Sequence, residues 1–340
     1  MQVISGTYSA EYGNAMSGII NITTREGGSK IRGNFNIKSS ALGIERSSVS
    51  YNRTVARLSL SGPLISKKTS FFISGNSDDG DSYLPWGYRN QYSIFSKIND
   101  RHLSNVKFSL AMNLSKRQRK RYSHSYKYIP EMYWYSPRTN SQMFKIGFTH
   151  TLSSNMYYGL SLYYNYYHYD DGDYDYHDLN PAYQRDENNE FYTLNYVSAY
   201  EENDQQTFGV KGDILWQANA NNEIKAGFEL RQHTLDRFYI SSPYYDDHIL
   251  DDYKRNPHEV AAYIQDKINF SSIILSAGLR FDLHAPNADY WVTPFDIEQD
   301  ITEAFKSSKS HTQLSPRLGT VSYTHLRAHE TSLHLVCRLL

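Results

Sequence analysis

The segment IKAGFELR, Ile224–Arg231, alternates apolar and polar side chains with a period of two. Successive side chains of an extended chain point to opposite faces, so this pattern predicts a β-strand with one apolar and one charged face. The apolar face carries Ile224, Ala226, Phe228 and Leu230, and the other face carries Lys225, Gly227, Glu229 and Arg231. Because charged residues occupy the middle of the segment, the strand does not fit a sheet that is buried on both faces.

Three further segments show the same alternation: residues 144–149, 158–166 and 273–282. Strands of soluble sheets are typically ~5–6 residues long, whereas a tilted strand that crosses a bilayer needs ~9–11 residues. The longer segments therefore favour a transmembrane β-sheet over a soluble sandwich.

The composition agrees with a membrane sheet. Of the 340 residues, 31 are tyrosine and 15% are aromatic, although the mean hydropathy is only −0.64. Aromatic rings gather at the interfaces of membrane barrels, and a polar lumen lowers the mean hydropathy. The 35 basic and 36 acidic residues nearly cancel, which argues against a general nucleic-acid-binding role.

Helical membrane insertion is excluded by the sequence, because no stretch approaches the ~18 uninterrupted apolar residues of a spanning helix. The start of the chain at Met1 also lacks the basic and apolar regions of a secretory signal. Since the strand pattern indicates an outer-membrane protein, we expect that Met1 is not the natural start.

Long and short connections alternate along the chain. The short ones are Pro63–Lys68, Asp100–Ser104, Ser153–Asn155, Ala218–Asn221 and Ser271–Ser272, and the long ones are Asp78–Asn90, Arg117–Asn140, Tyr169–Gln206, Leu235–Pro257 and Ala285–Gln313. Outer-membrane barrels place short turns in the periplasm and long loops outside the cell. This parity puts Phe191–Tyr200 inside a long loop, as an extended projection, and it predicts eleven spanning strands plus the start of a twelfth at Leu314.

A different pattern precedes the strands, in SAEYGNAMSGIINITTREGG at Ser9–Gly28. Glycines surround a short β-branched run, which predicts a turn-rich unit that ends in a strand. Barrels of ~22 strands have a lumen too wide for side chains to fill, and a separate plug fills it in outer-membrane transporters. The stretch therefore fits the C-terminal end of such a plug.

With the tyrosine before it, this stretch (YSAEYGNAMSGIINITTREGG) resembles the end of the plug domain of TonB-dependent outer-membrane receptors. LSGPL, AYIQDKI, AGLRFD and LSPRLG, which begin at Leu60, Ala262, Ala277 and Leu314, resemble recurrent barrel segments of the same family. Together with Lys211–Leu230, the plug stretch is most similar to Bacteroidetes-type receptors that carry a carboxypeptidase-regulatory-like domain ahead of the plug.

The resemblance implies an all-β fold: a fragment of a large antiparallel transmembrane β-barrel, about half of a 22-stranded one, preceded by the end of the plug. We expect residues 1–29 to belong to the plug and residues 30–320 to the partial barrel. The plug motif of the family falls on Glu11, Tyr12, Gly13, Gly18, Asn21 and Thr24. The signal peptide, the TonB-contacting box, most of the plug and the remaining strands are expected to be missing from this chain.

The function implied by the resemblance is active, TonB-dependent uptake of a scarce solute across the bacterial outer membrane, and not an enzymatic activity. The solute classes of the family are iron chelates, cofactors, peptides and oligosaccharides. The implied partners are the TonB complex, the solute, outer-membrane lipid, lipopolysaccharide and, as a further candidate, a surface lipoprotein; no nucleic acid is implied. The alternative is a passive or structural barrel, such as a porin or an adhesin, which would need no plug.

Aromatic loops are the candidate sites of ligand capture, because parity places them outside the cell. They contain Tyr133, Trp134, Tyr135, Asp173, Tyr174, Asp175, Tyr176, His177, Tyr244 and Tyr245. Flat rings with polar tips can stack on a solute and orient it, although they also form interfacial belts. The carboxylates of the Asp170–Asp178 loop could bind calcium, but the spacing differs from an EF-hand loop, so a solvated acidic loop is the simpler interpretation.

The basic run Lys116–Arg121 lies where a strand leads into a long loop. A rim that contacts anionic lipopolysaccharide or water explains it better than a nucleic-acid patch. Residues 321–340 lose the alternation and resemble a translated sequencing adapter, so we interpret them as a non-native tail. His325, His329, His334 and Cys337 imitate metal-ligand spacing in this tail, and no metal site is assigned to them.

Overall fold

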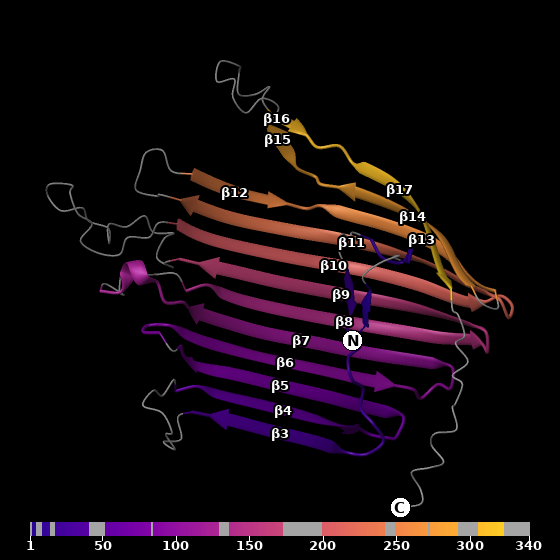
Figure 1. Cartoon of the computed structure of the whole chain (residues 1–340), viewed down its shortest axis with the longest axis horizontal. Coiled ribbons are helices and arrows are strands. Elements are labelled where there is room, and N and C mark those ends of the chain that lie inside the picture. The colour runs from indigo at the N-terminus through magenta and orange to yellow at the C-terminus, as the bar shows by residue number, and fades with distance from the viewer. Residues whose placement is uncertain are drawn as a thin grey trace, which may run out of the picture.

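The computed structural model describes residues 2–4, 9–13, 18–40, 52–82, 84–128, 136–172, 199–241, 249–270, 273–291 and 305–322. Most of these residues lie in the long strands of one antiparallel sheet (Figure 1). The single helical element in the described ranges is the short 3-10 helix His124–Tyr126. Within those ranges, no helix is both long and apolar enough to cross a bilayer.

The main sheet contains 13 strands in the order β3-β4-β5-β6-β7-β8-β9-β10-β11-β13-β14-β17, with β12 paired to β11 beside this path. Their bounds are β3 Arg32–Ser39, β4 Thr54–Pro63, β5 Thr69–Asp81, β6 Tyr88–Asp100, β7 Val106–Lys120, β8 Arg138–Ser153, β9 Met156–Asp171, β10 Ala199–Gln217, β11 Asn222–Ser241, β12 Ile249–Arg255, β13 His258–Phe270, β14 Ile273–Ala285 and β17 His311–Ser322. Two small pairs complete the described strands: β1 Gln2–Ile4 with β2 Ile19–Asn21, and β15 Asp289–Trp291 with β16 Phe305–Ser307.

Neighbouring strands pair along the chain as the alternation of short and long connections predicts, and the predicted last strand at Leu314 is β17. The sheet does not close on itself, because β3 and β17 lie at its two edges (Figure 1). An open edge leaves backbone groups without partners, which hydrocarbon cannot satisfy. In a membrane, these two edges therefore need further strands.

Several strands are longer than the sequence pattern predicts. β5 continues to Asp81, β10 begins at Ala199, and β11 continues to Ser241, where β12 pairs with it. These extensions carry charged and polar side chains on both faces, so the apolar alternation ends before the backbone hydrogen bonding does. Ala199 and Tyr200 form the first residues of β10, in its extension beyond the apolar band, while residues 191–198 lie outside the described ranges.

The two faces of the sheet follow the predicted alternation. In β10 and β11, Gly212 lies opposite Phe228 on one face, and the neighbouring pair Lys211 and Glu229 lies on the other. Phe228 and Leu230 are 41% and 43% exposed, whereas the side chain of Lys225 contacts the N-terminal segment. We call the face of Phe228 the outer face and the face of Lys225 the inner face.

Candidate plug-docking site

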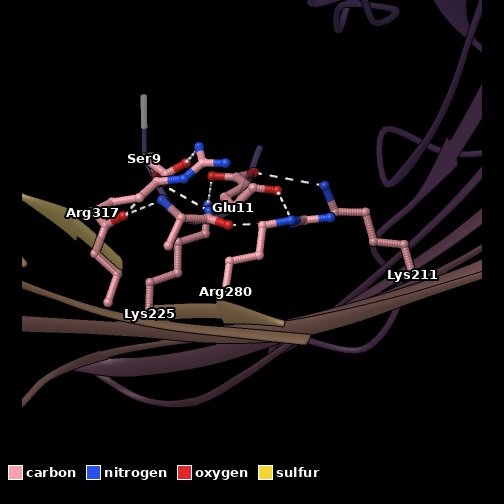
Figure 2. A network of polar contacts seen from close by, with 8 residues as sticks. Ser9, Glu11, Lys211, Lys225, Arg280 and Arg317 are labelled. Atoms are coloured by element: carbon pink, nitrogen blue, oxygen red, sulfur yellow. Dashed lines mark hydrogen bonds and ion pairs between the residues drawn. The ribbon is translucent and has the colours of Figure 1, made fainter. Parts of the chain in front are cut away.

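Glu11, the acidic residue of the plug motif, lies against the inner face of the sheet (Figure 2). Its carboxylate forms ion pairs with Lys225 of β11 and with Lys211 of β10, the latter at 3.7 Å between Lys211 Nζ and Glu11 Oε1. Only 18% of the Glu11 side chain is exposed. Two inward-facing lysines on neighbouring strands therefore form a docking point for one carboxylate of the N-terminal segment.

The backbone of the same segment is held by a buried arginine. Arg280 of β14 is 2% exposed, and its Nη1 donates to the carbonyl oxygens of Ala10 at 3.2 Å and Glu11 at 3.1 Å. Its Nε donates to the Asp282 carboxylate at 2.9 Å, which balances the buried charge. From β17, Arg317 Nη1 donates to the carbonyl of Ser9 at 3.0 Å (Figure 2).

A glutamine and a glycine complete the docking surface. The Gln265 side-chain oxygen accepts hydrogen bonds from Ser9 Oγ at 2.7 Å and from the Ala10 amide at 2.8 Å. Ala10 is fully buried, and a Cβ added to Gly278 would lie 2.8 Å from its methyl carbon. Gly278 therefore provides the space into which Ala10 packs, because no side chain fits there while the segment is docked.

The other predicted plug residues are brought together only in part. Tyr12 contacts Asn21, and burial followed by the neighbouring Glu11 charge raises the pKa of the Tyr12 hydroxyl, although Lys225 and the Asn21 hydrogen bond oppose the shift. Gly13 lies beneath the Arg280 guanidinium, since a Cβ there would be 2.5 Å from Nη2. The remaining two, Gly18 and Thr24, take no part in this network; Thr24 Oγ1 lies 3.4 Å from Lys97 Nζ.

A second acidic residue anchors the junction between the N-terminal segment and the sheet. Glu26 contacts Lys97 of β6 at 3.2 Å, Arg101 at 2.9 Å and Lys107 of β7. Burial alone would raise the pKa of Glu26, but the hydrogen bonds and charges of Lys107 and Lys97 outweigh it and lower the pKa. Next to it, a Cβ on Gly27 would lie 2.3 Å from a backbone oxygen of β5, so only glycine allows this close passage.

Sequence analysis missed the barrel residues that receive the segment, namely Lys211, Gln265, Arg280 and Arg317. A signal was nevertheless present, because all of them are polar residues in the middle of strands whose other face is apolar. An inward charge that is buried needs a partner. Which partner each one takes depends on the position of the segment in space, and strand alternation does not contain that information.

The predicted ligand-capture residues lie outside the described part of the chain, so the structure does not place Tyr133, Trp134, Tyr135, Asp173, Tyr174, Asp175, Tyr176, His177, Tyr244 or Tyr245. Two members of the proposed calcium loop are described. Asp170 binds Arg138 and His168, at 2.8 and 3.0 Å, and Asp171 accepts a hydrogen bond from the Ser136 amide at 3.1 Å. These carboxylates are thus already engaged with protein groups.

One group in the described residues has the composition of a metal site. Ligand atoms of His168, Glu202 and Asp204 lie within 4.8 Å of one another at the long-connection end of the outer face. His168 Nδ1 is already 2.9 Å from Asp204 Oδ1, and His168 Nε2 is 3.0 Å from Asp170. The imidazole therefore bridges two carboxylates, and this arrangement needs no metal to explain it.

Past the docked segment, toward the long-connection ends of β11 and β14, the inner face contains a cavity of about 280 Å³. Its lining includes Arg231, Glu259 and His284. Glu259 is paired with Arg231, and its Oε1 lies 3.3 Å from His284 Nδ1. The wall beyond the plug contact thus carries both acidic and basic groups, which are paired with one another.

Long antiparallel strands with an apolar outer face, a charged inner face and a segment docked on the inner face define the class of large β-barrels with an internal plug. A family model described as "TonB dependent receptor-like, beta-barrel" matches residues 51–329. The chain therefore belongs to the TonB-dependent receptor family. Proteins of this family are transporters and receptors of the outer membrane of Gram-negative bacteria. Comparison with curated proteins finds no match.

Solved structures with the same fold include a siderophore receptor, PirA from Acinetobacter baumannii, with a TM-score of 0.66 and 16% identity over 94% of this chain and 45% of that chain. The unliganded ferric citrate transporter FecA gives 0.65 and 13% identity over 94% and 46%, and the copper transporter OprC gives 0.60 and 11% over 94% and 46%. The chain thus spans about half the length of these structures, and at these identities the likeness concerns the fold.

Proposed function

We propose that this chain is the plug end and adjoining barrel wall of a receptor that imports a scarce solute across the outer membrane with energy delivered through TonB. The observation that carries the proposal is the docking of residues 9–13 on the inner face through Arg280, Gln265 and the two lysines that bind Glu11. A passive pore does not need a plug joined in line before its first strand, whereas a gated receptor requires one.

The docking contacts suit a plug that must be held and then moved. Apart from the packing of Ala10 against Gly278, the contacts are hydrogen bonds and ion pairs, so water can replace them when the segment shifts, at a net cost of ~1–3 kcal/mol per bond because most involve a charged group. An apolar interface of the same area would be harder to hydrate, so the segment would separate from the wall less easily. A pull on the N-terminal side of Ser9 would therefore separate these contacts one after another.

The solute is proposed to meet the protein on the outer side of the plug. The cavity beside Arg231, Glu259 and His284 supports this location, because it lies on the inner wall between the docked segment and the long connections. Trp134 and Tyr174 are the aromatic residues that we propose as first contacts in the external loops. Iron chelates and copper are carried by the similar transporters named above, and both belong in the panel of solutes to be tested.

Uptake by cells that carry the full-length receptor tests the proposal. Radiolabelled ferric citrate, ferric siderophores, copper and cobalamin are supplied with and without an uncoupler of the proton gradient, and in cells with and without TonB. We expect one class to accumulate only when both the gradient and TonB are present, and to accumulate less with Trp134→Ala or Tyr174→Ala at matched surface abundance. Accumulation that depends on neither the proton gradient nor TonB would identify a passive pore instead.

A further inference from the structure

The inner face of β4 to β7 carries an excess of positive charge near the long-connection ends of these strands. The strand register, followed from β11 to β4, places these basic residues on it: Arg53, Arg57, Arg89, Arg117 and Arg119. Among the described residues of β3 to β8, Asp78 is the single acidic side chain on the same face. One carboxylate is therefore surrounded by several guanidinium groups.

Asp78 holds part of this cluster together. Its carboxylate accepts hydrogen bonds at 2.8 Å from both Nε and Nη2 of Arg53, and it lies 3.8 Å from Nη1 of Arg89. Gly80 lies directly opposite Arg89, which in turn lies opposite Arg119. A Cβ on Gly80 would be 2.4 Å from the Cα of Arg53, so the absence of a side chain lets Arg53 approach its neighbours. Arginines of β6 and β7 and the arginine before β4 are thereby brought to one place.

Much of this positive charge has no acidic partner. Arg117 and Arg119 form no ion pair with the described residues, and neither does Arg121, which follows β7. The basic run found in the sequence divides between the two faces, because Arg117 and Arg119 project inward whereas Lys116 projects outward. Unpaired cations on the wall of a lumen attract anions, since the low-dielectric walls concentrate their field.

The arginines continue into a cavity of about 660 Å³ at the rim, where the strands end. Arg89, Arg119 and Arg121 line it, and Lys120 and Asp81 of the outer face also reach it. From Arg53 to Arg119 the basic surface crosses the spacings between β4 and β7, or ~14 Å at ~4.8 Å each. A compact anion engages only a few of these groups at once. An extended ligand with several separate anionic groups engages them all.

The row of side chains next to the arginines, one step nearer the midplane, is uncharged. It consists of small amide and hydroxyl groups in direct register from β5 to β8: Asn76, Ser93, Ser115 and Ser141. Such groups both donate and accept hydrogen bonds, as the hydroxyls of a sugar do. In β5 to β8 this row has no aromatic ring, whereas single-stranded nucleic acids bind by stacking their bases on such rings. The row therefore favours a hydroxyl-rich ligand.

We propose that this surface binds an acidic oligosaccharide. We call it the arginine wall, and it consists of Arg53, Arg57, Arg89, Arg117, Arg119 and Arg121. The carboxylate or sulfate groups of the sugar pair with the planar guanidinium groups, which bind such oxyanions through two parallel hydrogen bonds. Its hydroxyls bond to the neighbouring serine and asparagine row. The inference rests on the proposed function, to which it adds a class of solute, so an acidic oligosaccharide joins the panel supplied to cells.

Isothermal titration calorimetry of the full-length receptor in detergent tests the arginine wall. The probes are a galacturonate hexamer, a sulfated heparin hexasaccharide, neutral maltohexaose, a short single-stranded oligonucleotide and ferric citrate. We expect an acidic hexasaccharide to bind at least about tenfold more tightly than the other three kinds of probe, and its affinity to fall as the salt concentration rises. Equal affinity for maltohexaose, preference for the oligonucleotide or ferric citrate, or no binding of either acidic hexasaccharide would overturn the proposal.

Charge-matched variants separate the arginine wall from net charge. Arg117→Gln combined with Arg119→Gln should weaken binding of the acidic hexasaccharide by about tenfold or more. Arg32→Gln combined with Lys116→Gln also removes two positive charges, but from the short-turn end of the inner face and from the outer face. This control should bind as the unmodified receptor does. Equal weakening in the two double variants, both checked for heat-modifiable barrel on gels, would overturn the proposal.

Calorimetry requires neither TonB nor the proton gradient, so it separates this inference from the proposed function. A receptor that binds the acidic hexasaccharide at the arginine wall, but accumulates no solute in energised cells, would support the inference and contradict the proposed uptake. TonB-dependent accumulation of another solute by a receptor that does not bind the acidic hexasaccharides would support the uptake and overturn the inference.

Discussion

Lys225 and Phe228 lie three positions apart on β11, and their surroundings differ completely. Lys225 projects inward and pairs with a carboxylate more than two hundred residues earlier in the chain, whereas Phe228 projects outward and is 41% exposed. Hydrocarbon requires only that a side chain be apolar, so many residues could replace Phe228. The lumen side requires a particular partner in a particular place. Substitutions on the outer face should therefore affect assembly of the barrel in the membrane. Substitutions on the inner face should affect how well the docked segment closes the lumen.

The strongest test of this difference is a charge on the outer face. Phe228→Arg should destabilise the full-length barrel by roughly 2 to 4 kcal/mol if the residue lies near the bilayer midplane. The measurement is unfolding in lipid vesicles, supported by the fraction of heat-modifiable barrel on gels. Lys225→Gln serves as the control and should assemble normally. Equal losses for the two variants would mean that the faces are assigned wrongly.

A smaller effect is expected where the inner face receives Ala10. Gly278→Val would place atoms in the space that this methyl group occupies, since even a Cβ there is 2.8 Å from it. Overpacking of this kind costs ~1–3 kcal/mol, and we expect it to displace the docked segment while the barrel still assembles. Cells with this variant should become sensitive to a large hydrophilic antibiotic. Gly33→Val, on the outer face of β3, should leave the barrel closed, and equal leakage from both would refute the docking role of Gly278.

Exchange of the charges at the docking point provides a more specific test. Glu11→Lys and Lys225→Glu should each weaken closure, and the double variant should recover part of the loss, because it restores opposite charges at one place. The coupling of neighbouring residues is typically 0.5–3 kcal/mol, and we expect a value near the lower limit because Lys211 also contacts Glu11. The antibiotic sensitivities of the unmodified receptor, the two single variants and the double variant together complete the double-mutant cycle. Additive effects would show that the two residues do not act together.

The sequence was sufficient for the strands and their faces, because alternation with a period of two follows directly from strand geometry. Asp266 interrupts the apolar face of β13, which also carries Ile264 and Ile268. The structure explains this residue without a register shift in the β11 and β13 pairing: Asn222, at the short-turn end, donates to its carboxylate at 2.8 Å. Strand ends were less predictable, since β10 and β11 continue as polar ladders beyond the apolar band.

Only the N-terminal half of the docking site could be predicted from the sequence. Glu11 and Tyr12 were found because the motif that contains them is local, whereas Arg280 and Gln265 contribute from strands more than two hundred residues away. The strand that ends the plug motif is β2, Ile19–Asn21. Ile20 and Ile22 in and after β2 are 64% and 68% exposed, so local propensity alone does not extend the strand.

The smallest predicted effect concerns the second acidic contact, Glu26, and depends on pH. Its pKa is lowered from the usual 4.5 by Lys107 and Lys97 against the opposing effect of burial. A lowered pKa in the folded state means that the stabilisation is complete above the unfolded value and is lost as the pH falls through the folded value. The pH window therefore lies below about 4.5, and the loss of stability should be ~1 kcal/mol or less, as for a partly exposed ion pair.

Unfolding of the full-length barrel in vesicles between pH 3 and 6 measures this loss. Glu26→Gln is the control, because it should remove the part of the pH dependence that Glu26 contributes. An identical pH dependence in the two proteins would show that Glu26 contributes nothing to the junction and that the contacts of residues 9–13 hold the segment to the inner face without it.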